Sequence, residues 1–254
     1  MKRLFFYALA MFFLIMTLHA CDLFEAEHPY PDGKASVRVM HIAPLASESI
    51  SYFHMDEVIF TNLNFGDVTD FTDVPVGRNP DGFLNADGDT LAVRDLMRGG
   101  NMDMRFFDFE RSFTVFVMHG PAAAENVRIR SMEIEPVPNA DGKARVRILH
   151  AVSGAGSVDV YLSAPNQGLD DEDLLAIDLP FNNEGGAADT APAEMPLYAA
   201  ADPGTYNIQI TANNDSNVIY SESVTLDASR NYTMILYPTA ENDGIDRIFL
   251  LADN

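Results

Sequence analysis

The chain has 254 residues, of which 38 are acidic and 16 basic, giving a net charge of −22 at pH 7, and it contains one cysteine. A surface this negative excludes nucleic acid as a partner, because nucleic-acid binding needs clustered Lys and Arg against phosphates. The single cysteine excludes an intramolecular disulfide, so we expect stability to come from apolar cores. The charge favours solubility as its role, with binding of cations or of a basic partner as the alternative.

The first segment, residues 1–20, has the order of zones of an export signal: two basic residues, an apolar run over 4–18, and a small residue before Cys21. An apolar helix of this length rises about 22 Å, which is too short for a hydrocarbon core of about 30 Å. The pattern Leu18-His19-Ala20-Cys21 predicts cleavage before Cys21 and lipidation of its sulfur. An ordinary signal peptide with an incidental cysteine is the alternative.

Lipidation at Cys21 would place the protein in the bacterial cell envelope, anchored on the extracytoplasmic (periplasmic) side. Asp22 resembles the signal that retains enterobacterial lipoproteins on the inner membrane, so we favour that membrane over the outer one. Residues 21–33 are acidic and contain two prolines, and we expect them to form a tether.

The rest of the chain repeats one module. Residues 32–41 read DGKASVRVMH and residues 141–150 read DGKARVRILH, which agree at seven of ten positions. Later in each copy, RSFTVFV at 111–117 aligns with RNYTMIL at 230–236. A period near 110 residues corresponds to a whole small domain. The predicted divisions are a first domain, a Pro-containing linker and a second domain: 34–135, 136–142 and 143–254.

Within both copies apolar residues alternate with polar ones, which predicts strands with one face on a core and one face in water. The runs 113–118 and 232–237 are apolar on both faces and are expected to be central strands. Turn signals of the Asn/Asp-Gly type separate seven or eight candidate strands per copy. We therefore predict an all-β chain with two tandem immunoglobulin-like antiparallel β-sandwich domains after a lipoprotein signal peptide.

Three segments of the second copy, VRILHAVSGAGSVDVYLSAPNQG, GTYNIQITA and SVTLDASRNYTMILY, resemble the domain of unknown function 4397 family. The resemblance covers most of residues 143–238, and in the first copy it covers the opening strand and residues near 111–119. It implies exported bacterial β-sandwich modules, often in tandem and often on lipoproteins. It implies no activity.

Two histidines, His41 and His150, occupy the same place in the two copies. One interpretation is a pair of ligands or acid–base residues. The favoured interpretation is structural, with half-buried rings whose nitrogens bond backbone groups at the strand end. Asp159 could orient His150, but Ser51 replaces it in the first copy, which argues against a shared catalytic dyad.

The acidic loops at 79–95 and 165–190, including Asp170–Asp173, could bind calcium through oxygen ligands. The EF-hand register fails at both ends of its loop, so we interpret them as solvated surface. We assign no catalytic residue, no cofactor and no metal ligand. The predicted function is a non-enzymatic, lipid-anchored envelope module that presents its sandwiches to an envelope protein or a polysaccharide. A carbohydrate- or calcium-binding module is the alternative, and a hydrolase with a carboxylate pair is a third hypothesis.

Overall fold

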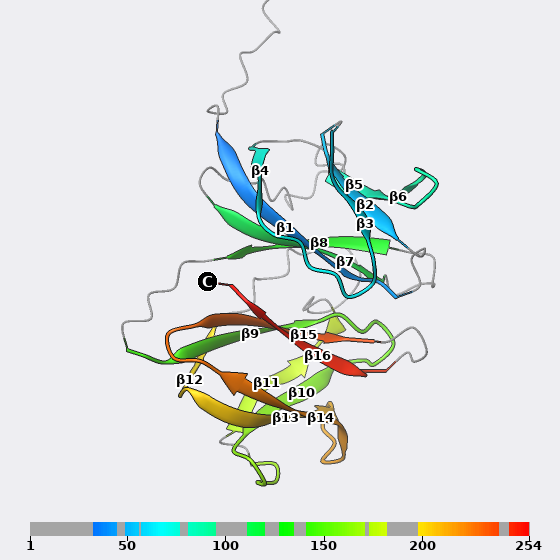
Figure 1. Ribbon diagram of the computed structural model, residues 1–254. Coiled ribbons are helices and arrows are strands. Elements are labelled where there is room, and N and C mark those ends of the chain that lie inside the picture. The colour runs from blue at the N-terminus through cyan, green and yellow to red at the C-terminus, as the bar shows by residue number, and fades with distance from the viewer. Residues whose placement is uncertain are drawn as a thin grey trace, which may run out of the picture. The chain divides into compact units, whose positions relative to one another are not determined.

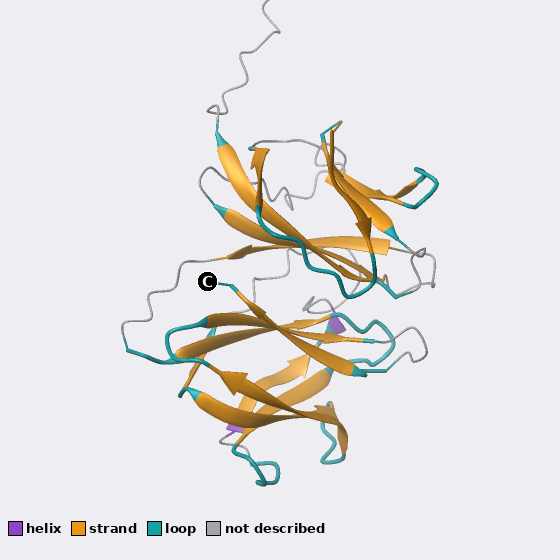
Figure 2. Cartoon of the chain, in the orientation of Figure 1, coloured by secondary structure: helices purple, strands orange, loops and turns teal. Residues whose placement is uncertain are grey.

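The computed structural model describes the following residues: 33–44, 49–55, 57–76, 81–94, 111–119, 127–134, 141–170, 173–181, 198–238 and 244–253. These residues form strands joined by loops, and the two short helical pieces in Figure 2 are 3-10 helical turns, so no α-helix occurs among the described residues. None of them forms a helix with the length and hydropathy needed to cross a bilayer. The predicted signal segment, Cys21 and Asp22 lie outside the described residues.

The first repeat forms two four-stranded sheets that face each other (Figure 1). Sheet 1 has the strand order β3 (Glu57–Leu63), β2 (Ile50–His54), β5 (Asp81–Leu84) and β6 (Thr90–Arg94). Sheet 2 has the order β4 (Thr72–Pro75), β1 (Lys34–Ile42), β7 (Ser112–His119) and β8 (Val127–Ile134). Their inner faces share one core, whose fully buried members include Val37, Val39, Tyr52, Phe83 and Val115.

The second repeat follows the same plan. Sheet 3 has the order β12 (Ala199–Ala201), β9 (Ala144–His150), β15 (Asn231–Tyr237) and β16 (Arg247–Ala252). Sheet 4 has the order β11 (Leu174–Leu179), β10 (Val158–Ser163), β13 (Gly204–Ala212) and β14 (Val218–Leu226). Their common core includes Val146, Ile148, Val160, Ile208 and Met234.

The predicted all-β fold of tandem β-sandwiches is confirmed. One pairing in each repeat differs from the antiparallel expectation, since β1 runs parallel to β7 and β9 runs parallel to β15. The other strand pairs of the four sheets are antiparallel.

A third apolar core lies between the two repeats, where the outer face of sheet 2 packs against the outer face of sheet 3. Met40 and Phe116 from sheet 2 and Leu149 and Ile235 from sheet 3 are all fully buried in it. The expectation that β1 and β9 turn one face to water was therefore wrong. Each large side chain buried here contributes about 1.5–3 kcal/mol, which makes the contact energetically comparable to a domain core.

The described residues of the two repeats therefore form four sheet layers in the order 1, 2, 3, 4, with a core between each neighbouring pair. The middle strands β1, β7, β9 and β15 are covered on both faces, which explains why their sequences are apolar at successive positions.

Candidate functional site

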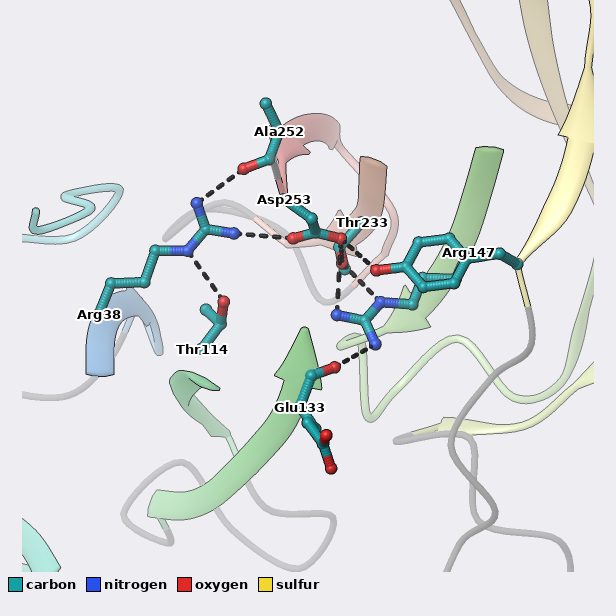
Figure 3. Close-up of polar contacts among 8 residues, drawn as sticks. Arg38, Thr114, Glu133, Arg147, Thr233, Ala252 and Asp253 are labelled. Carbon is teal, nitrogen blue, oxygen red and sulfur yellow. Dashed lines mark hydrogen bonds and ion pairs between the residues drawn. The ribbon is translucent and has the colours of Figure 1, made fainter. Parts of the chain in front are cut away.

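The most polar feature of the buried interior is a group of charged side chains at the contact between sheets 2 and 3 (Figure 3). Asp253, just after β16, has a carboxylate that is 0% exposed. Its Oδ1 accepts a hydrogen bond from Arg38 Nη2 at 2.8 Å, and its Oδ2 lies 3.5 Å from Arg147 Nη2. One carboxylate of the second repeat thus pairs with an arginine from each repeat.

Two hydroxyl groups complete the surroundings of this carboxylate. Thr233 Oγ1 and Tyr198 Oη each donate to Asp253 Oδ2 at 2.7 Å. The backbone N–H of Asp253 donates to Asn231 O at 2.8 Å, so the residue is also fixed through its main chain. Both oxygens of the buried carboxylate therefore have hydrogen-bond donors, as a buried polar group requires.

The two arginines have matching surroundings, because each makes an equivalent hydrogen bond to a threonine and an equivalent contact with an aromatic ring. Arg38 Nε donates to Thr114 Oγ1 at 2.9 Å, and Arg147 Nε donates to Thr233 Oγ1 at 2.8 Å. The aligned runs at 111–117 and 230–236 place these two threonines at equivalent positions. The guanidinium of Arg38 lies 4.9 Å above the ring of Phe71, and that of Arg147 lies 4.8 Å above the ring of Tyr198.

Each arginine also reaches across to the other repeat. Arg38 Nη1 donates to Ala252 O at 2.7 Å, and Arg147 Nη1 donates to Glu133 O at 2.7 Å. Both acceptors lie near the end of the last strand of their repeat, opposite equivalent residues of β7 and β15. The two repeats therefore meet through the same surface on each, related by an approximate two-fold axis. Such an isologous contact is closed and does not propagate into a filament.

The symmetry is broken at the carboxylate and at Phe71, which has no hydroxyl group to match that of Tyr198. Asp253 follows Ala252 in the second repeat, and the residue that follows Glu133 in the first repeat is Ile134, which is 9% exposed. A second carboxylate there would bring two anions together at the axis. The single carboxylate instead serves both cations. The pKa of Arg38 is lowered, chiefly by burial, while Asp253 acts in the opposite direction.

The two histidines lie at the ends of β1 and β9 and are both fully buried. His150 Nδ1 accepts from the Val152 N–H at 3.3 Å, and its Nε2 lies 2.8 Å from Gly156 O. In the first repeat, His41 Nδ1 accepts from the Ala43 N–H at 3.3 Å. Their bonds to backbone groups at the strand ends agree with the structural interpretation, although the rings are buried rather than half-buried.

Burial lowers the pKa of His150, and the hydrogen bond to Gly156 O offsets this only in part. The ring is therefore neutral near pH 7, with Nδ1 as acceptor and Nε2 as donor. Asp159, which was considered as its orienting partner, has a different role. Its Oδ1 accepts from the Asp178 N–H at 2.7 Å and its Oδ2 from the Asn214 N–H at 3.4 Å, so it caps an irregularity between β10 and β11.

The acidic loops considered for calcium are described only in part. In the loop between β5 and β6, Asn85 Oδ1 accepts from the Asp89 N–H at 2.7 Å, and the Gly88 N–H donates to Asn85 O at 3.1 Å. This is an internally bonded turn. In the second loop, the Asp173 N–H donates to Asp170 O at 3.0 Å, while residues 171–172 and 182–190 lie outside the described part of the chain. The described residues contain no group of three His, Cys, Asp or Glu placed to hold a metal ion.

Sequence reasoning did not identify Arg38, Arg147 or Asp253 as important. A usable signal was present for the arginines, since each interrupts an apolar strand at the same place in both repeats of a chain with only 16 basic residues. The period-two pattern assigned them to a solvent face. For Asp253 no repeat or motif gives a signal.

Comparison with solved structures gives similarities at low identity. The product complex of a multi-modular glycogen-degrading pneumococcal virulence factor, SpuA, is 12% identical with a TM-score of 0.25; the match covers 87% of this chain and 22% of that one. A structure titled "Alpha-glucan binding by a streptococcal virulence factor" is 10% identical with a TM-score of 0.26, and the match covers 87% of this chain and 97% of that one. At these TM-scores neither similarity supports an argument about this chain.

A search of curated proteins gave no significant match. One protein-family model does match, over residues 35–161, which is half of the chain. The match spans the first repeat together with β9 and the first part of β10, whereas the sequence resemblance is strongest in the second repeat. The chain therefore belongs to the family described as Domain of unknown function (DUF4397).

Proposed function

We propose that the chain is a lipid-anchored, non-enzymatic protein of the bacterial cell envelope that presents two joined β-sandwiches to an extracytoplasmic partner. The observation that carries this proposal is the contact between the repeats. Its most buried charged groups, Arg38, Arg147 and Asp253, bind one another and backbone carbonyls. Reactive sites need polar groups that open onto substrate, so this closed network serves the contact between the repeats and is not itself a reactive site.

The contact between sheets 2 and 3, called the joint below, supports a presenting role because it restricts the motion of one repeat relative to the other. Two sandwiches on a simple linker would move as separate bodies, since interfaces between domains are generally small and polar. Here an apolar core and a buried ion network hold sheets 2 and 3 together. The outer faces of sheets 1 and 4 then keep a constant spacing, which suits a protein that displays binding surfaces.

The anchor is the second part of the proposal and rests on the sequence around Cys21. With a net charge of −22, the protein has no electrostatic attraction to anionic headgroups, so attachment would depend on the lipid. We propose attachment on the periplasmic side, at the inner membrane in view of Asp22.

The test compares two single substitutions in cells fed a labelled fatty acid. Cys21→Ser should abolish labelling and remove the protein from the membrane fraction. Asp22→Ser, the matched control, should stay labelled and change only the membrane to which the protein fractionates. Membrane association of Cys21→Ser at the wild-type level would contradict the anchor. Cross-linking with mass spectrometry then identifies the partner, and turnover of a wall polymer by the purified protein would contradict the non-enzymatic role.

A further inference from the structure

Three strands of sheet 4, β10, β13 and β14, turn mainly uncharged polar side chains away from the core of the second repeat. Alternation along β10, β13 and β14 turns Val160, Ile208 and Val224 into the core and turns the intervening residues outward. The outward side chains carry hydroxyl or amide groups almost throughout: Tyr161, Ser163, Thr205, Asn207, Gln209, Thr211, Ser221, Ser223 and Thr225.

The strand register places these groups in rows across the sheet. Asn207 lies between Ser163 on one side and Ser223 on the other. The next row contains Tyr161, Gln209 and Ser221, in that order. Neighbours within a row are about 4.8 Å apart, and successive rows are about 7 Å apart. The result is an array of hydrogen-bonding groups with one aromatic ring, in which Ser163, Gln209 and Thr211 are buried and the serines of β14 are exposed.

Part of this array is fixed by bonds among its own members. Gln209 Nε2 donates to Ser163 Oγ at 3.1 Å and to Gln167 O at 3.1 Å. The side chains of Gln209 and Ser163 are buried. Thr205 Oγ1 and Thr225 Oγ1 lie 3.2 Å apart on the exposed surface. Ser221 and Ser223 are exposed, and Asn207 and Tyr161 are half-buried. Each row thus joins one buried polar side chain, Ser163 or Gln209, to an exposed serine on β14, Ser223 or Ser221.

Charge decides which ligand matches this face. The chain has 38 acidic residues, but the outward positions of β10, β13 and β14 hold a single one, Asp159, whose two oxygens already accept backbone N–H groups. An anionic polymer would be repelled by the surrounding protein, and a basic partner would prefer the acidic loops. A neutral polyhydroxylated ligand forms hydrogen bonds with such a face without either conflict, and its apolar ring faces can stack on Tyr161.

We propose that the outer face of sheet 4 binds a neutral polysaccharide, an inference that rests on the presenting role proposed above and names its ligand. It moves the carbohydrate-binding alternative from the loops at 79–95 and 165–190 to strands β10, β13 and β14 of sheet 4. The sugar chain lies along the β14 side of these rows, with hydroxyl groups bonded to Asn207, Ser221 and Ser223.

The experiment is affinity electrophoresis of the purified chain from residue 22 onward in gels containing glycogen, galactomannan, xyloglucan or the anionic polygalacturonate. Wild type should be retarded by at least one neutral polymer and not by polygalacturonate. Ser223→Glu introduces a charge at an exposed position of the array and should weaken retardation at least tenfold. Thr61→Glu introduces the same charge at an exposed position of β3 in sheet 1 and should leave retardation unchanged.

Absence of retardation in all neutral gels would overturn the proposal, as would equal retardation of wild type and Ser223→Glu. Melting temperatures of both variants should match wild type, because both side chains are exposed. Failure of the polysaccharide test would not refute the envelope role. That role is tested separately by fatty-acid labelling at Cys21 and by in-cell cross-linking, which do not depend on this face.

Discussion

Among single substitutions, Asp253→Ala should weaken the joint between the repeats most. The carboxylate is 0% exposed, accepts from Arg38, Thr233 and Tyr198 at 2.7–2.8 Å, and lies 3.5 Å from Arg147. Its removal leaves two buried guanidinium groups without their anion. Breaking a buried ion pair by removing one partner costs about 3–5 kcal/mol. For a unit of this size that corresponds to a fall in melting temperature of about 6–20 °C.

The assay is thermal and urea unfolding followed by circular dichroism. Asp202→Ala is the matched control: this carboxylate pairs with Lys143 at 2.9 Å but is 75% exposed, so solvent screens the pair and stability should barely change. The triple change Arg38→Met, Arg147→Met and Asp253→Leu should regain much of the loss, because it removes the buried charges together. A loss of only about 1 kcal/mol would lower the melting temperature by as little as about 2 °C. If Asp253→Ala melts within about 2 °C of wild type, our account of the network is therefore refuted.

Two further predictions concern single sites. Gly82→Ala should lower the free energy of unfolding by about 1–3 kcal/mol, because an added Cβ would lie 2.4 Å from the backbone oxygen of Ala92. The control is Gly168→Ala, whose Cβ would meet nothing within 4 Å and which should melt close to wild type. Equal melting temperatures of the two variants would contradict this packing. The pKa of His150 is lowered from 6.5 in the folded state, so as the pH falls the unfolded chain binds this proton first, and stability is lost from pH 6.5 down through the folded pKa. Unfolding measured between pH 8 and 5 should therefore show a shallower loss of stability in His150→Gln than in wild type. Identical slopes would disprove this prediction.

The β-sandwich fold could be predicted because its signals are local. The repeat at 32–41 and 141–150, the alternation of β9 and the Asn/Asp-Gly turns each restrict a short segment to strand or turn. The parallel pairing of β1 with β7 has no such signal. It joins residues about 75 positions apart, such as Val39 and Val115, and depends on how the whole sheet assembles.

The joint could not be predicted for a related reason. Met40 and Leu149 are apolar at positions that the alternation assigns to water, and a partially apolar outer face is common among soluble proteins. Only the three-dimensional arrangement shows that these faces cover each other. Asp253 lies beyond the last aligned strand, so its contact with Arg38, 215 positions away, follows from packing alone.

Double electron–electron resonance between spin labels on the two repeats tests the joint most directly. Labels at Thr61→Cys on β3 and Ser223→Cys on β14 occupy exposed sites on sheets 1 and 4, in a chain that carries Cys21→Ser. A joint held by the buried network predicts one narrow distance distribution, which broadens when Asp253→Ala is added. A broad distribution in the chain that retains Asp253 would contradict the account, because the repeats would then move as separate bodies.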